Sequence, residues 1–414
     1  MKMFQATKLL HCFIGEMSIL KANEFRGERG IVLILGLLLL LILTLIGISA
    51  LSTSIYDIRI SGNEKSSVQA FYVAEAGINE LMARFRTGVT NPIPDSDPLN
   101  PAWRLLLAKD SGKGATTIGY VSTDPNSISS LQDQLDFGVE IKHKIDAKNQ
   151  VVQYGGVPVY LIRSYGFSID GGNKILEVEL LRSPDYDPPA AFYSGRPIHV
   201  HGSSIYLNGN DGCGTVNKPG IITITTTNPP IAKSGNPSVD GSPPEVTLTS
   251  DPPPINLPIR EMIDYLKGDA DFKYAYDENQ TLTGYSDNWG TPSHSGIDIP
   301  ISYSGPMNIV YFNMNGDKTL RLAGDSHGAG ILVVEGNLEI TGDFTWYGII
   351  LVAGAVNYTG GGEKNVTGGI FSGENTSIDV NIDGITGILF CSAVSSRLKE
   401  IIPPLKITRW REVF

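Results

Sequence analysis

Residues 31–51, IVLILGLLLLLILTLIGISAL, contain no charged side chain and are almost wholly aliphatic. In an α-helix this stretch would reach ~30 Å, the thickness of the hydrocarbon core of a bilayer. A surface helix of a soluble domain would carry a polar stripe, and this one carries none. The hydroxyls of Thr44 and Ser49 can bond to carbonyls of the same helix. The stretch therefore predicts a membrane-inserted helix.

The distribution of basic residues predicts its orientation. Five precede it: Lys2, Lys8, Lys21, Arg26 and Arg29. The residues just after it are balanced, with Asp57 and Arg59. Because an excess of basic residues stays on the cytoplasmic side, the rest of the chain is expected to be exported. The apolar region is too long for a cleaved signal peptide, so we expect it to stay in the mature protein.

The helix is expected to continue beyond the apolar stretch, over residues 31–88. No proline occurs from residue 52 to residue 85, and apolar side chains recur at spacings of three and four. They are Val68, Phe71, Ala74, Ile78, Leu81 or Met82, and Phe85. This stripe predicts one helical face that packs against the exported part of the chain.

Three motifs in this region carry a family resemblance. Arg29-Gly30 precedes the aliphatic run with LTLIG at 43–47, ISGNEK follows at 60–65, and AFYVAEAG at 70–77. Together they resemble the N-terminal domain of the PilX-type minor pilins of type IV pilus systems. The resemblance implies a prepilin that prepilin peptidase cuts after a glycine and that is then N-methylated. Gly30 would end a cytoplasmic leader over residues 1–30, and Ile31 would begin the mature chain.

Some features leave alternatives open. Major pilins have a glutamate at the fifth mature position, where this chain has Leu35. By resemblance, this implies a rare or terminal position in the fibre. Gly27 is a second candidate cleavage point, but it would leave Glu28 and Arg29 at the head of a helix in lipid. Met17 is an alternative start, and an uncleaved single-pass anchor is the alternative to processing.

The resemblance also implies the partners and the location. The partners would be other pilins and minor pilins, prepilin peptidase, the inner-membrane pilus assembly platform and membrane lipid. The chain would lie in the inner membrane with its bulk periplasmic or extracellular, and in the pilus after assembly. A formal net charge of −11 argues against nucleic acid as a partner, because phosphate requires a basic surface.

The exported part is expected to be mostly β-structure, which gives an α+β fold class. Apolar-alternating runs at 137–145, 157–169 and 174–181 are separated by Gly-Gly turns. They predict an antiparallel β meander over residues 89–185, with its dry face on the long helix.

A repeat marks residues 186–414. Glycine followed by a short apolar strand recurs at Gly330, Gly348, Gly369 and Gly387, with spacings of 18, 21 and 18 residues. A period near 20 predicts a parallel β-solenoid. Second strands are expected at 338–340, 355–357 and 378–380, and a first coil at 197–207. A Pro-rich insertion around 215–300 would contain a short helix at 259–266 that caps or flanks the solenoid.

The three cysteines are Cys12, in the presumed leader, and Cys213 and Cys391, in the exported part. In an oxidising compartment Cys213 and Cys391 could form one disulfide if their Cα atoms lie within about 7 Å. Two separate buried thiols are the alternative.

Catalysis is not predicted. The candidate carboxylates do not recur at equivalent positions beside a basic residue; they are Asp211, Glu335, Glu339, Asp343, Asp379 and Asp383. His199 and His201 share one strand face but lack a third ligand, so no metal and no cofactor is predicted. Aromatic residues near polar turns could stack on sugars or contact a protein partner, and core or turn packing is the alternative: Trp289, Tyr303, Tyr311, Trp346, Tyr347 and Tyr358.

The sequence thus predicts a structural minor pilin that takes part in type IV pilus assembly and displays a β-solenoid. Two alternatives stay open: a surface adhesin that binds glycans through the solenoid, and a membrane-anchored enzyme acting on envelope polysaccharide.

Overall fold

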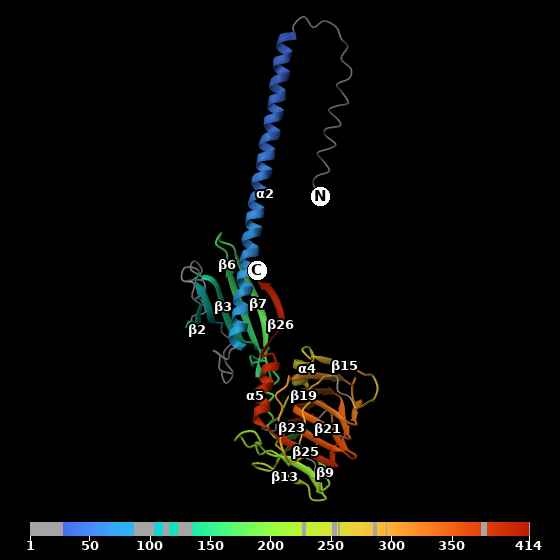
Figure 1. Ribbon diagram of the computed structural model, residues 1–414. Helices are drawn as coiled ribbons and strands as arrows, with labels where there is room; N and C mark the ends of the chain where they lie inside the picture. The colour runs from blue at the N-terminus through green and yellow to red at the C-terminus, as the bar shows by residue number, and fades with distance from the viewer. Residues whose placement is uncertain are drawn as a thin grey trace. The chain divides into compact units, whose positions relative to one another are not determined.

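The computed structural model describes residues 28–86, 103–110, 116–122, 135–225, 229–250, 255, 257–284, 288–294, 296–373 and 379–413. The chain divides into two units, Met1–Val68 and Gln69–Phe414. Helix α2 (Glu28–Arg86) begins in the first unit and ends in the second. Most of the remaining described residues form β-strands, so the predicted fold class is confirmed (Figure 1).

The first unit is described from Glu28 and consists of the N-terminal part of α2. The aliphatic side chains from Val32 to Leu41 are all largely exposed. Within the described residues, α2 is the one helix long and apolar enough to cross a membrane. The Thr44 hydroxyl donates to the Leu41 carbonyl at 2.8 Å, so this polar group is satisfied without an outside partner, as predicted.

The second unit contains an antiparallel sheet. Its described strands are β1 (Arg104–Asp110), β2 (Thr116–Ser122), β3 (Leu135–His143), β6 (Tyr160–Phe167), β7 (Asn173–Arg182) and β26 (Leu405–Val413), in the order β2-β1-β3-β6-β7-β26. A separate small hairpin is formed by β4 (Gln153–Tyr154) and β5 (Val157–Pro158). Apolar and polar residues alternate along these strands because one face of the sheet packs against α2. This alternation is the pattern that predicts the meander.

The end of α2 packs closely on that face. Ala70, Ala74, Ile78 and Leu81 are buried, whereas Val68, the first residue of the predicted stripe, is 47% exposed. A Cβ atom at Gly166 in β6 would lie 2.1 Å from the Ala70 carbonyl oxygen. Small residues on both elements therefore let the helix and sheet backbones approach, which shifts the buried row to start at Ala70.

The rest of the second unit is a parallel β-solenoid. In its first sheet the strands are β8 (Phe192–Ser194), β10 (Ile205–Asn208), β11 (Ile221–Ile224), β13 (Ser238–Asp240), β14 (Glu245–Leu248), β15 (Phe272–Ala275), β17 (Asn308–Asn313), β19 (Ser326–Glu335), β21 (Phe344–Val352), β23 (Glu363–Ser372) and β25 (Ile385–Phe390). In its second sheet they are β9 (Ile198–His201), β12 (Ile231–Ser234), β16 (Gln280–Thr283), β18 (Thr319–Ala323), β20 (Asn337–Thr341), β22 (Val356–Thr359) and β24 (Val380–Asp383).

The coils do not stack in chain order. The first sheet runs β13-β10-β25-β23-β21-β19-β17-β15, and the second β12-β9-β24-β22-β20-β18-β16. The chain therefore enters the stack at β8–β10, builds one end with β11–β14, and then starts the opposite end at β15. From there it winds back until β24 and β25 pair with β9 and β10. We call the contact between these chain-distant coils the coil junction.

The core runs through the coil junction without interruption. Leu332, Ile350, Ile370 and Phe192 lie in register on neighbouring strands and are fully buried. Phe192 comes from the early coil, whereas the other three belong to the coils that wind back. The same apolar column thus stabilises both sides of the coil junction.

The boundaries of the solenoid differ from the prediction. The sequence predicts a solenoid over residues 186–414, but the last strand, β26, pairs antiparallel with β7. The solenoid is therefore inserted between two neighbouring strands of the antiparallel sheet. The region 215–300 is also more than an insertion, because it supplies β11–β14 at one end of the stack and β15 and β16 at the other. Such short, proline-interrupted strands give little periodic signal.

The register of the repeat is also corrected. Gly330 pairs with Gly348, but Gly348 pairs with Gly368 rather than with Gly369, and Gly387 pairs with Asn365. Gly330, Gly348 and Gly368 form a corner stack with φ of 117°, 147° and 140°. At this corner, β19, β21 and β23 bend from one face of the coil to the next.

Two helices cover one side of the first sheet. Helix α4 (Ile259–Lys267) buries Ile259, Met262, Ile263 and Leu266, which confirms the predicted helical stripe. It lies against β19 and β21 and so flanks the solenoid. Helix α5 (Ser392–Ile401) lies against β21 and β23 and leads into β26.

Candidate functional site

The predicted processing residues lie at the start of α2. Gly30 falls in the first turn of the helix, and Ile31 opens its exposed apolar stretch. Leu35, at the predicted fifth mature position, is 67% exposed on the helix surface. Gly27, Met17, Cys12 and most of the predicted leader lie outside the described residues. A peptidase that cuts after Gly30 would leave a helix head without charged side chains, which suits insertion in lipid.

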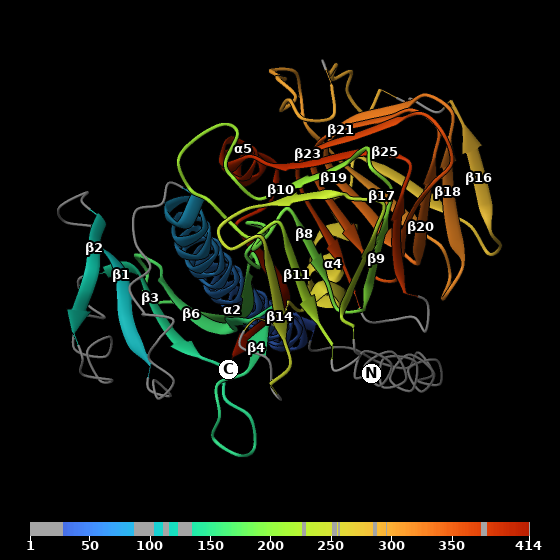
Figure 2. The same ribbon diagram turned by 90° about the horizontal axis from the view of Figure 1, so that it is seen from below.

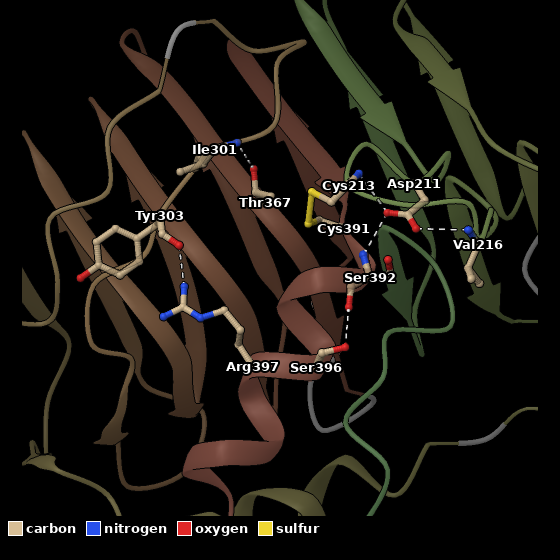
Figure 3. The surroundings of a disulfide bond; sticks show 10 residues. All are labelled: Asp211, Cys213, Val216, Ile301, Tyr303, Thr367, Cys391, Ser392, Ser396 and Arg397. Carbon is tan, nitrogen blue, oxygen red and sulfur yellow. Dashed lines mark hydrogen bonds between the residues drawn. A yellow bond between two sulfur atoms is a disulfide. The ribbon is translucent and has the colours of Figure 1, made fainter.

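The coil junction carries the predicted cysteine pair. Cys213 follows β10, and Cys391 follows β25, the strand that pairs with β10. The structure joins the two cysteines in a disulfide with a Cα–Cα distance of 5.1 Å, across 178 residues of sequence (Figure 3). The disulfide therefore crosslinks the two coils that meet at the coil junction, which are not joined there by the backbone. The sequence indicated the pair but not its place between coils.

Asp211 makes a second connection at the coil junction. Its Oδ1 accepts from the backbone N–H of Ser392 at 3.0 Å and of Cys213 at 3.1 Å, and its Oδ2 accepts from the N–H of Val216 at 3.2 Å. Helix α5 begins at Ser392, and its N-cap residue, Cys391, makes no side-chain cap. Asp211 therefore caps this helix from another coil, and its negative charge faces the positive end of the helix dipole.

These hydrogen bonds set the protonation of Asp211. Burial alone would raise the pKa of the carboxyl group, but bonds from Ser392, Cys213 and Val216 favour the ionised form and lower the pKa below its usual value. Because the folded pKa is depressed, the stabilisation is present above the unfolded pKa. It is lost as the pH falls through the folded pKa.

We predict that Asp211→Ala lowers the free energy of unfolding by about 1–2 kcal/mol at neutral pH, since α5 loses its cap. Asp211→Asn keeps one acceptor oxygen and should cost less. Urea unfolding at pH 7 and at pH 3 checks this: the difference between wild type and Asp211→Ala should shrink at pH 3. A difference that is the same at both pH values would contradict the assigned role of the carboxylate.

A loop over residues 296–306 lies on the outer side of β23, beside α5 and near the coil junction. The Ile301 N–H donates to the Thr367 hydroxyl on β23 at 2.8 Å. Arg397 of α5 donates to the carbonyls of Tyr303 and Gly305, each at 2.6 Å (Figure 3). Together with the disulfide and Asp211, these contacts link α5 and the loop to the coil junction.

The six candidate carboxylates of an enzyme are taken up by separate structural contacts. Asp211 caps α5, Glu335 accepts from Tyr311, and Glu339 accepts from Thr359 at 3.1 Å. The other three lie elsewhere on the solenoid. Asp343 accepts from the Glu363 N–H, Asp379 lies near His199, and Asp383 accepts from the Gly384 N–H. Asp343 and Asp383 both act electrostatically on Lys364, and the contacts above bring no other two of these carboxylates together.

His199 and His201 project from one face of β9, as predicted, with their rings parallel and 6.1 Å apart. Their nitrogens face different groups. His199 Nε2 lies 3.3 Å from Asp379 Oδ2, and His201 Nδ1 lies 2.7 Å from Ser234 Oγ. Among the described residues, the groups that could hold a metal do not include this pair.

Most of the aromatic residues proposed to stack on sugars are packing residues. Trp289, Trp346 and Tyr358 are fully buried, and Tyr311 and Tyr347 are nearly so. Tyr303 is half-buried and lies 5.7 Å from Tyr347, ring to ring. Of the two alternatives for these aromatics, the structure therefore favours core and turn packing over a sugar-binding surface, because they lie inside the coil or under the covering elements.

Comparisons with known proteins bear on the N-terminal region. The family described as PilX N-terminal matches residues 29–79. No curated protein matches the chain. Among solved structures, the competence-associated pilin ComZ from Thermus thermophilus is similar at 14% identity over 84% of this chain and 97% of that one, with a TM-score of 0.22. A score this low does not establish a shared fold. The match confirms that residues 29–79 resemble the PilX N-terminal family, as the three sequence motifs predict.

Proposed function

We propose that this protein is a minor pilin that enters or primes a type IV pilus through α2 and displays the solenoid outside the membrane. The observation that supports this best is the PilX N-terminal match at residues 29–79, which coincides with the apolar helix. In this proposal the helix holds the subunit in the inner membrane before assembly. Neighbouring pilins would then cover its exposed aliphatic side chains in the fibre.

The proposal assigns Gly30 and Ile31 to processing. Prepilin peptidase would cut between them on the cytoplasmic face, and the new N-terminus would be methylated. The assembly platform would then extract the helix from lipid. Leu35 stands where major pilins have a glutamate, so this subunit lacks a carboxylate to pair with a neighbour's N-terminal amine. This supports a rare or terminal position of the subunit in the fibre.

The architecture of the second unit supports display. Because the solenoid is inserted between β7 and β26, both of its connections return to the antiparallel sheet that carries α2. A large domain can be accommodated there without interrupting the helix or its packing face. The distributed carboxylate contacts give no support to the alternative of a polysaccharide-active enzyme.

Fractionation tests the proposal. An epitope-tagged full-length chain should appear in the sheared pilus fraction of cells with a working assembly platform. It should remain in the inner membrane when the platform is deleted, because extraction needs that platform. A matched chain with Ala74→Glu, in which a charge enters the helix–sheet contact, should be lost from both fractions. A wild-type chain confined to the inner membrane in both strains would contradict the proposal.

A further inference from the structure

The second solenoid sheet has a continuous polar outer face. In β18, β20, β22, β24 and β9 the apolar residues point into the coil, and the residues between them point out. One outer row runs in register over five neighbouring strands, through Arg321, Glu339, Asn357, Asn381 and His199. A second row lies two residues further along four of these strands, through Thr341, Thr359, Asp383 and His201, and continues to Ser234 on β12, whereas β18 has Ala323 at this position. We call these ten positions the polar ladder.

Contacts within the polar ladder hold many of its side chains. Thr359 donates to Glu339 at 3.1 Å, and Asn381 Nδ2 donates to Asn357 Oδ1 at 3.3 Å. Arg321 Nε lies 3.6 Å from Glu339, and His201 lies 2.7 Å from the Ser234 hydroxyl. Side chains fixed in this way lose less rotamer freedom when a ligand binds, which lowers the entropic cost of recognition.

The two solenoid sheets differ in what lies on their outer sides. Apolar residues such as Ile331, Ile349 and Val333 point outward from the first sheet and pack in one buried cluster with residues of α4 and α5. On the second sheet, Arg321, Asp383, His201 and Ser234 are exposed, and the other ladder residues are half-buried. Figure 2 shows β16, β18 and β20 side by side in this second sheet.

The charge of the polar ladder is nearly balanced. It contains one arginine and two carboxylates, and Arg196 and Asp379 add one charge of each sign beside it. The chain as a whole carries a formal charge of −11. A polyanion would meet no excess of positive charge here, and the ladder holds too little excess negative charge to select a polycation. Hydroxyl, carboxamide and imidazole groups instead match the hydrogen-bonding groups of a neutral, hydroxylated ligand.

We infer that the polar ladder binds an extended, neutral polysaccharide whose axis runs across the strands. Neighbouring parallel strands lie about 4.8 Å apart, so each sugar of a flat β-1,4-linked chain over β20, β22, β24 and β9 meets the two ladder residues of one strand. The rows supply donors and acceptors to the sugar hydroxyls on both edges of the chain. The absence of a large aromatic side chain from these ten positions predicts weak binding per sugar that adds up along the chain.

Sedimentation with insoluble glycans tests the inference. Full-length protein, in a detergent without a sugar headgroup, is mixed with cellulose and with chitin as neutral probes and with cross-linked polygalacturonate as an acidic probe. The wild type should bind at least one neutral probe. Thr341→Ala/Thr359→Ala removes two facing hydroxyls from neighbouring strands and should weaken that binding at least about tenfold. His201→Ala, an exposed change, should weaken it as well.

The control is Thr247→Ala/Thr408→Ala, which removes two exposed threonines from β14 and β26, outside the polar ladder. It should bind like the wild type, and unfolding temperatures should show that all variants are folded. The inference is overturned if no neutral probe is bound, if only polygalacturonate is bound, or if the ladder and control variants bind equally. None of these outcomes affects the pilus assignment, because the assay requires neither processing nor assembly.

Discussion

Replacing Gly348 with alanine should lower the free energy of unfolding of the solenoid by at least about 3 kcal/mol. Gly348 has a φ of 147°, which an L-residue rarely adopts, and a Cβ atom there would lie 1.8 Å from the Gly330 carbonyl oxygen. The next coil meets the same constraint, because a Cβ at Gly368 would lie 2.0 Å from the Gly348 carbonyl oxygen. Alanine must therefore displace β19 from β21 at the corner.

Thermal unfolding measures this effect, and the midpoint should fall by about 5–10 °C. Gly361→Ala is the matched control, since it lies in the same domain and a Cβ there meets nothing within 4 Å. That variant should unfold within about 2 °C of the wild type. Equal midpoints for Gly348→Ala and Gly361→Ala would show that the corner stack does not limit the coil geometry.

Removing the disulfide at the coil junction should cost about 2–5 kcal/mol. The bridge closes a loop with a sequence separation of 178 residues, so its loss increases the conformational entropy of the unfolded chain considerably. It also frees the junction between β10 and β25. Cys213→Ser/Cys391→Ser should therefore unfold at a lower urea concentration than the wild type.

Reductant provides the internal control for this prediction. It should destabilise the wild type to the level of the double variant and leave the double variant unchanged. Thiol labelling of the exported wild-type protein should find neither Cys213 nor Cys391 reactive until reductant is added. Two freely labelled thiols together with a midpoint insensitive to reductant would contradict the bridge.

Elements whose side chains repeat at a regular spacing along the chain could be predicted from the sequence. The uncharged run at 31–51 predicted the membrane-type helix, strand alternation predicted the antiparallel sheet, and the glycine-led period predicted the parallel coils. In each case a repeated spacing along the chain corresponds to one face of an element. The short helix at 259–266 was predictable for the same reason.

Long-range pairing was not predictable in this way. Nothing near residues 405–413 indicates that β26 returns to β7, and no local signal shows that β24–β25 stack on β9–β10 rather than on an open end. Trp289 is likewise buried by a contact that no local pattern shows, since its ring lies 6.4 Å from that of Trp346, in another coil. The cysteine pair could be proposed, but the role of Asp211 as the cap of α5 depends on the three-dimensional contact alone.

The most direct test of the pilin assignment is the N-terminal residue and intact mass of the mature protein, from cells with and without active prepilin peptidase. We expect a chain that begins at N-methylated Ile31 when the peptidase is active, and an unprocessed chain when it is not. Gly30→Glu should give the unprocessed chain in both strains. A wild-type N-terminus upstream of Gly30 that does not change with the peptidase would contradict the assignment.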